Sequence, residues 1–169
     1  MSAINDALAQ LKVILAAVTA SPQPAPVGAY LYPSEWEAIN DKPQNDQLPI
    51  FTIEQVVNRD TPWRRKAMGR GIHGWEADIR LYLHRGQLIN HADVAAAAAK
   101  QTEWYLAVST ALFANQTLNG TAHTIGQNAV PGNLFTYRTG QMIWSGGVWW
   151  GIGFSLPVFQ VHTQPMAAQ

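Results

Sequence analysis

The strongest constraint on the fold is an alternation of apolar and polar side chains between residues 75 and 84. One set consists of Trp75, Ala77, Ile79, Leu81 and Leu83, and the interleaved set consists of Glu76, Asp78, Arg80, Tyr82 and His84. Successive side chains of a β-strand point to opposite faces of the sheet, so this pattern predicts a strand with one buried and one solvent-exposed face. Such a strand needs a partner strand and a layer that covers its apolar side.

The segment before this strand predicts its partner. Residues Leu48 to Asn58 are rich in β-branched and aromatic side chains, and Pro49 stands near the start, where a missing N–H group is tolerated. We expect the two strands to form an antiparallel hairpin, joined by a basic hairpin loop over residues 59 to 74. A short strand over residues 27 to 32 is also expected.

Two segments have the three- and four-residue spacing of amphipathic helices. The first covers residues 3 to 20, with Ser2 as a candidate N-cap and a stop at Pro22. The second covers residues 92 to 114, where Asp93 lies near the start and an alanine run favours the helix. The face expected to cover a sheet contains Val94, Ala97, Gln101, Trp104, Val108 and Leu112.

The chain returns to β-structure after residue 117. Strands are predicted at residues 134 to 138, 141 to 144 and 148 to 161, with a turn at Ser145 to Gly147. One face of the last strand is apolar, whereas the other carries Trp149, Gly151 and Gly153. The glycines allow a second backbone or an aromatic ring to approach closely, and a bulge is an equally good interpretation.

Composition indicates one folded domain over residues 1 to 169, and the order of elements indicates the α+β class. We expect a mostly antiparallel sheet packed against the two helices. Only 13% of the residues are charged, about half of the usual ~25%, which is typical of a surface that a neighbouring subunit partly covers. The net charge of zero gives no overall attraction to nucleic acid.

The sequence offers few starting points for catalysis. It has no cysteine, its histidines lack a short ligand spacing, and it contains no hydrolase, zinc-protease or nucleotide-binding motif. Glu76 and Asp78 could act as a general acid and base, but alternating carboxylates are also expected on the wet face of a strand. No apolar run approaches the ~20 residues that span a bilayer. We therefore expect a protein without enzymatic activity, cofactor, metal or membrane contact.

One local concentration of charge stands out in the loop after the second predicted strand. It contains Arg59, Trp63, Arg64, Arg65, Lys66 and Arg70, with only Asp60 to oppose the basic residues. These side chains could contact phosphates, with Trp63 stacking or docking. A solvated hairpin tip, or one paired with acidic residues of a neighbouring subunit, is favoured because the cluster is short and the net charge is zero.

A second candidate contact lies in the irregular excursion from Pro33 to Gln47. Loops longer than ~12–15 residues are uncommon in compact domains, and they are usually functional or ordered by a partner. The candidate inter-subunit contacts are Glu35, Trp36 and Glu37 in this excursion, together with Trp149 on the glycine face of the last strand.

The order of elements resembles the tail terminator proteins of long-tailed bacteriophages and the related tail-completion and neck proteins. The resemblance depends on the helix Ile4 to Val18, the strand pair Leu48 to Asn58 and Trp75 to Leu83, the helix Val94 to Leu112, and the strand Val148 to Val161. It is a match of topology over nearly the whole chain, without a signature motif.

The resemblance implies a virion structural protein of the tail and neck, made in the host cytoplasm. Such a protein forms a homo-oligomeric ring, expected to be a hexamer, that caps the tail tube and joins it to the head-tail connector. The loop Arg59 to Arg70 would then lie at the lumen, with non-specific contact to genomic DNA, or between rings. The excursion Pro33 to Gln47 would meet a neighbour or the tube protein.

Two alternatives stay open at this point. The chain is another phage tail, neck or tube subunit, which would stack on instead of stopping at one ring. Or it is a small nucleic-acid-binding module that uses Arg64, Arg65 and Lys66 with Trp63.

Overall fold

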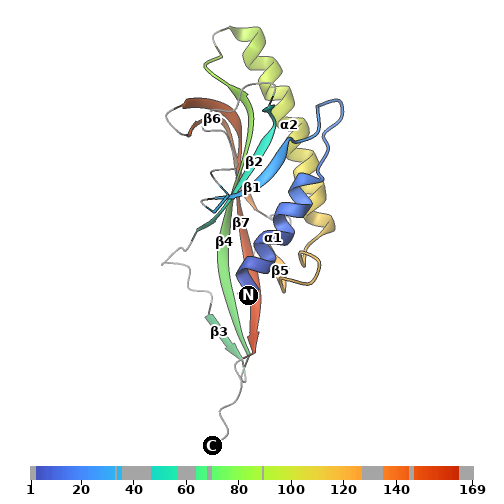
Figure 1. Ribbon diagram of the computed structural model, residues 1–169, viewed down its shortest axis with the longest axis vertical. Helices are drawn as coiled ribbons and strands as arrows, with labels where there is room; N and C mark the ends of the chain where they lie inside the picture. The colour runs from blue at the N-terminus through green and yellow to red at the C-terminus, as the bar shows by residue number, and fades with distance from the viewer. Residues whose placement is uncertain are drawn as a thin grey trace, which may run out of the picture.

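The computed structural model describes residues 3–32, 34–35, 47–56, 64–67, 70–88, 90–126, 135–144 and 147–163. Two helices, α1 (Ala3–Ala16) and α2 (His91–Ala114), accompany seven strands within these ranges (Figure 1). The strands are β1 (Gly28–Tyr32), β2 (Ile50–Val56), β3 (Arg64–Ala67), β4 (Arg70–Arg85), β5 (Thr124–Ile125), β6 (Thr136–Trp144) and β7 (Gly147–Thr163). The expected α+β class is confirmed.

The strands form one mixed sheet. Its order is β1-β2-β4-β7-β5, with β3 added beside β4 and β6 added beside β7. The expected antiparallel hairpin is found, because Ile53 of β2 pairs with Ile79 of β4 in an antiparallel ladder. The sheet is mixed because β1 runs parallel to β2, which the expectation of a mostly antiparallel sheet did not include.

Pairing of β4 with β7 is the central feature of the sheet. The two strands stay in register from Arg70 opposite Thr163 to Arg85 opposite Trp149, apart from one bulge. Shorter strands attach to both outer edges of this pair, β2 and β3 on β4 and β5 and β6 on β7.

Both helices lie on the same face of the sheet (Figure 1), and the main core lies between them. The helices contribute Leu11, Leu15, Trp104, Val108 and Leu112, each at most 1% exposed. The sheet contributes Phe51, Ile53, Ile79, Leu81, Ile152 and Phe154, also at most 1% exposed. Each such side chain stabilises the fold by about 1.5–3 kcal/mol relative to leaving it in water. The predicted buried face of residues 75 to 81 is confirmed, and that of the second helix is confirmed from Gln101 to Leu112, whereas Val94 and Ala97 are only half-buried.

A second, smaller core lies on the opposite face. Strand β6 curls over this face at one end of the sheet (Figure 1), and Trp144 stacks on Tyr82 with ring centroids 4.4 Å apart. Tyr82 is 1% exposed, so its predicted place on a solvent-exposed face is wrong. The pattern of one strand could not show that the closing hairpin folds back to cover that face.

A β-bulge changes the alternation at the end of β4. Tyr82 pairs with Gly151, but the next pair joins His84 to Trp150, so Leu83 is the extra residue. Trp150 lies two positions before Ile152 in β7, so both side chains point to the face that the helices cover. The residue paired with Trp150, His84, therefore points to the same face. The predicted solvent-facing position of His84 is wrong for this reason.

Element boundaries differ from the predictions in four places. Helix α1 ends at Ala16 and not at residue 20, and α2 begins after Asn90, whose side chain accepts from the backbone N–H of Asp93. The residues predicted as two strands after 134 form the continuous strand β6. The basic segment is also not all loop, because β3 pairs with the first residues of β4.

Gly151 marks the tightest approach of β7 to its neighbours. A Cβ atom there would overlap the carbonyl oxygen of Leu81 and lie 2.7 Å from the methyl group of Met142. At Gly153 the nearest atom would be Arg138 Nε at 3.3 Å, part of a flexible side chain. The predicted close approach of a second backbone is confirmed at Gly151 but not at Gly153, and the bulge considered as the alternative lies opposite, at Leu83.

We predict that Gly151→Ala lowers the free energy of unfolding by about 3 kcal/mol or more, because backbone atoms of β4 would have to move. Gly153→Ala is the matched control and should cost about 1 kcal/mol at most, since the Arg138 side chain can shift. Urea denaturation followed by circular dichroism measures both values. Equal losses for the two variants would contradict the close contact at Gly151.

Candidate functional site

The predicted basic cluster falls on a part of the sheet that projects beyond the helices. Strands β4 and β7 continue past α1, with β3 alongside them (Figure 1). The backbone of Arg64, Arg65 and Lys66 lies in β3, and Arg70 begins β4. Arg59 and Trp63 lie outside the described residues. The cluster is therefore carried in part by a strand at the far end of a β-ribbon, and not by a loop close to the body.

Glu35 is the one residue of the predicted excursion contacts that falls within the described ranges. Its Oε2 accepts from the backbone N–H of Leu31 at 2.8 Å, and its own N–H donates to the carbonyl of Leu31 at 2.8 Å. In a parallel ladder both groups of one residue point to the same side, so these groups of Leu31 face away from β2. Glu35 thus occupies part of the free edge of β1. Trp36 and Glu37 lie outside the described residues.

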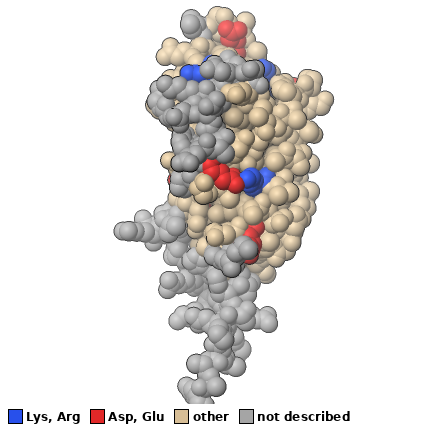
Figure 2. Space-filling model, viewed as in Figure 1, with Lys and Arg blue, Asp and Glu red and all other residues tan. Residues whose placement is uncertain are grey.

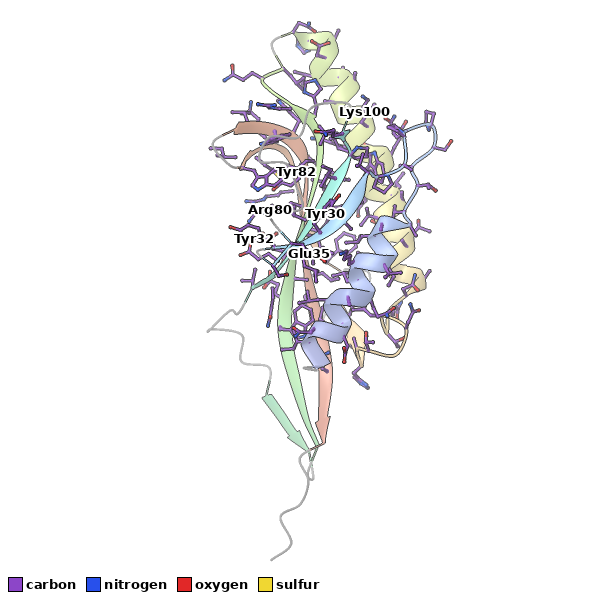
Figure 3. The ribbon with its side chains drawn as sticks, in the orientation of Figure 1. Tyr30, Tyr32, Glu35, Arg80, Tyr82 and Lys100 are labelled. Atoms are coloured by element: carbon purple, nitrogen blue, oxygen red, sulfur yellow. The ribbon has the colours of Figure 1, made fainter. Side chains whose placement is uncertain are left out.

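An ion pair fixes Glu35 to the first helix. Lys12 Nζ of α1 lies 2.5 Å from Glu35 Oε1, and the two side chains are 34% and 32% exposed. Partial burial raises the pKa of the Glu35 carboxyl, but the hydrogen bonds from Lys12 and Leu31 and the lysine charge outweigh it and leave that pKa below its usual value of 4.5. Figure 3 labels Glu35 close to the end of β1.

Trp149, the fourth predicted contact, lies in the second core. It is 1% exposed, its Nε1–H donates to the carbonyl of Trp144 at 3.0 Å, and Arg85 lies 5.7 Å from its ring centre. A ring this buried in the single chain presents no surface to a neighbouring subunit. Trp149 is buried because β6 curls over the face of β7 that carries Trp149 and the glycines.

Strand β6 is an open edge that the sequence analysis did not single out. It pairs with β7 on one side, and no other strand among the described residues pairs with its second side. It also carries two exposed apolar side chains, Ile143 at 81% and Tyr137 at 52%. An unpaired edge with exposed apolar side chains is a template for association with another chain. The sequence did predict a strand over residues 141 to 144, but the position of that strand at an edge depends on the order of the strands in the sheet.

The outer side of α2 is apolar as well. Leu106 and Phe113 are 58% and 48% exposed, and a spacing of seven residues places them on one stripe of the helix. Figure 2 shows the helix-bearing side with only a few charged side chains among the atoms that are not grey. The chain therefore presents two different apolar surfaces, the β6 edge and the α2 stripe.

The carboxylates considered for acid–base chemistry form a polar network on the second face. Arg80 donates to Asp78 Oδ2 from its terminal nitrogen at 2.7 Å and from Nε at 3.0 Å, and it lies 3.8 Å from Glu54. Burial lowers the pKa of the Arg80 guanidinium, but Asp78 outweighs this and the net pKa is raised. The Ser155 hydroxyl donates to Glu76. Pairing of this kind is the structural role expected of charged groups on a strand face.

A pocket of about 300 Å³ opens beside Asp78 on this face. Its lining consists of Asp78, Thr136, Tyr137, Arg138, Gly153, Phe154 and Ser155, without a histidine among these residues. Burial raises the pKa of the neighbouring Tyr82 hydroxyl, and interactions with Thr52 and Arg80 oppose part of this rise.

In the described part of the chain, no group of three or more His, Asp or Glu side chains is arranged to hold a metal ion. No helix of that part is long and apolar enough to cross a membrane.

We predict that Glu35→Gln lowers the free energy of unfolding at pH 7 by about 0.5–1 kcal/mol, because a half-exposed ion pair contributes little more. The folded-state pKa of Glu35 is depressed, so this contribution is complete above pH 4.5 and is lost as the pH falls through the folded value. Urea titrations of both proteins between pH 7 and pH 3 measure the difference.

Glu103→Gln provides the control. It removes a carboxylate that accepts from the uncharged amide of Gln23 at 2.7 Å, so the same charge is lost without an ion pair. A stability difference for Glu35→Gln that stays constant down to pH 3 would contradict the assigned role of the Lys12 pair.

Scans of the chain against models of protein families and against curated protein sequences find no match.

Proposed function

We propose that this chain is a virion structural protein, the tail terminator of a long-tailed bacteriophage. It assembles into a homo-oligomeric ring that caps the tail tube and joins it to the head-side connector. The observation that carries the proposal is the unlike character of two edge strands, β1 and β6. Edge β1 is partly occupied by Glu35, whereas edge β6 is unpaired among the described strands and carries exposed Ile143.

Unlike surfaces favour ring assembly. When one patch of a subunit contacts a different patch of the next, the contact is heterologous and generates either a closed ring or a filament. Two exposed apolar surfaces are available for this, the β6 edge and the α2 stripe of Leu106 and Phe113. We infer that the β6 edge of one subunit packs on the α2 stripe of its neighbour.

The low charge content supports a surface that is covered on assembly. Only 13% of the residues are charged, and several large apolar side chains are 40% exposed or more. These are Val13, Val27, Tyr32, Leu106, Phe113, Tyr137 and Ile143. Contact surfaces of oligomers are depleted in charge in the same way.

The projecting β-ribbon suits a second contact, along the axis of the assembly. Strands β3, β4 and β7 extend beyond the body (Figure 1), and they carry Arg64, Arg65, Lys66 and Arg70 there. In a ring, such a projection reaches an adjoining ring or the lumen. Basic residues in either place would contact an acidic neighbour or DNA phosphates.

Another tail, neck or tube subunit is the second candidate, because the same heterologous contact produces a stack when it does not close. A small nucleic-acid-binding module is the third, and it rests on the basic cluster alone. Solution mass and images separate the first two candidates, and binding to duplex DNA tests the third.

We predict a closed ring when the purified protein is studied by light scattering over a concentration series and by negative-stain imaging. A monomer that closes into one ring on added tail tubes would agree equally well with the proposal. Long stacks would favour a tube subunit, and a stable dimer would show that like surfaces pair with each other. A monomer that ignores tail tubes and binds duplex DNA would favour the nucleic-acid module.

The location of the contact is tested by charged substitutions. Ile143→Lys and Leu106→Lys should each prevent ring formation and leave the thermal midpoint within about 2 °C, since both side chains are exposed. Val27→Lys is the matched control, because Val27 is 55% exposed beside the occupied edge of β1. If the ring forms with Ile143→Lys but not with Val27→Lys, the contact lies at the β1 edge, and the proposed contact through β6 is contradicted.

We also predict that replacing Arg64, Arg65 and Lys66 together with serine leaves folding intact, because charges far from the core contribute little to stability. A thermal melt checks this, and a large fall in the melting temperature would contradict it. Duplex DNA binding of this variant at several salt concentrations then shows whether the cluster contacts phosphates.

A further inference from the structure

A small pocket lies between the first turns of α2 and the ends of β4 and β7. Its volume is about 140 Å³. The strands contribute Leu83, His84 and Trp150, the helix contributes Asp93, Ala96, Ala97, Lys100 and Gln101, and Leu88 comes from the connection between β4 and α2. None of these residues belongs to the predicted contacts.

Two features of the chain create the pocket. The bulge at Leu83 turns His84 toward the helices, where it joins its partner Trp150. The alanine run gives the facing side of α2 short side chains at Ala96 and Ala97, which do not fill the space above these rings. One turn further along, Gln101 closes the gap, since its Nε2 donates to the carbonyl of Gly151 at 3.0 Å.

Two aromatic nitrogens in this lining lack a protein partner. His84 Nδ1 and Trp150 Nε1 are both buried, and neither makes a hydrogen bond to any described residue. A buried donor without a partner costs about 1–3 kcal/mol, and most buried polar groups in folded proteins are therefore satisfied. Two such atoms in the lining of one pocket indicate that a group inside it forms hydrogen bonds with them.

The polar groups of the pocket favour an acceptor with negative charge. The indole of Trp150 can only donate, and the ammonium of Lys100 can only donate as well. Asp93 is the one acid in the lining, and its Oδ2 already accepts from Asn90 Nδ2 at 2.7 Å. Trp150 and Lys100 therefore supply the donors, and a carboxylate can accept a hydrogen bond from each of them, assisted by the lysine charge.

We propose that this pocket binds a single carboxylate group attached to a short apolar chain. The Trp150 N–H and the Lys100 ammonium hold the carboxylate, His84 donates when its proton is on Nδ1, and Leu83, Leu88 and the alanines contact the chain. A volume of about 140 Å³ is below the ~300–1,000 Å³ of sites for drug-sized ligands, which excludes a nucleotide.

The same chemistry has two sources. The carboxylate belongs either to a free short-chain acid or to an Asp side chain, Glu side chain or C-terminus of a neighbouring copy. The inference does not depend on the proposed ring, since the pocket is built within one chain.

The indole N–H signal of Trp150 provides a direct test. The chain has seven tryptophans, and Trp150→Phe assigns the signal in a ¹H–¹⁵N TROSY spectrum of the full chain. Sodium butyrate is added at constant ionic strength against sodium chloride, and butyramide serves as the uncharged ligand of matched shape. A dilution series without added carboxylate tests the neighbouring copy as the source.

A saturable shift of the Trp150 signal with butyrate is expected, with butyramide binding about tenfold more weakly because the hydrogen bonds lose their charge assistance. Lys100→Met should weaken butyrate binding by about two- to fivefold, and Lys12→Met, which changes a lysine of α1, should leave it unchanged. A signal that responds to dilution and not to butyrate would assign the carboxylate to a neighbouring copy.

Three results would overturn the proposal. One is a Trp150 signal that moves neither with butyrate nor on dilution, which would leave the two nitrogens to ordered water only. The second is equal affinity for butyrate and butyramide, which would exclude a charged ligand. The third is a butyrate response that Lys100→Met leaves unchanged. This comparison can be made even if Trp150→Phe is too unstable to study.

Discussion

The structure depends on the long pairing of β4 with β7. Helix α2 packs on this pair and α1 packs on the neighbouring β1 and β2, and every other strand except β1 attaches to one edge of the pair. The pairing is close enough at Gly151 that any Cβ atom would overlap the backbone of Leu81. Close approach of two backbones requires glycine, so position 151 could not carry a larger side chain on that face.

The same pairing decides what each face of the sheet can do. On the helix side it presents an unbroken row of large apolar residues from Ile152 to Val158, which the helices cover. On the other side the glycines leave room for Met142 and for the ring cluster of Tyr82, Trp144 and Trp149. The small core under β6 thus follows from the glycines, and it leaves β6 itself at the edge.

Sequence reasoning succeeded where the signal is local and failed where distant segments meet. The period of two from Trp75 to Leu81 reflects one strand on one core, so its burial could be predicted. Tyr82 and His84 could not, because a closing hairpin covers one and a bulge turns the other. For the candidate site, Glu35 was predicted as an inter-subunit contact from its place in a long loop, whereas its hydrogen bonds to Leu31 and the open edge at Ile143 depend on strand order.

The asymmetry of the two edges has a physical cause and a consequence. Exposed strand edges promote uncontrolled pairing, and a chain limits this by covering them with its own groups. Glu35 does so at β1, where Lys12 holds it in place, whereas at β6 Ile143 is 81% exposed, and Tyr137 packs on Tyr105 of α2 but stays 52% exposed. In the proposed assembly, this difference would direct association to the β6 edge. If like edges paired, two copies would satisfy each other and growth would stop at a dimer. A ring requires β6 to meet a different surface, and the exposed stripe of Leu106 and Phe113 on α2 supplies an apolar surface of that kind.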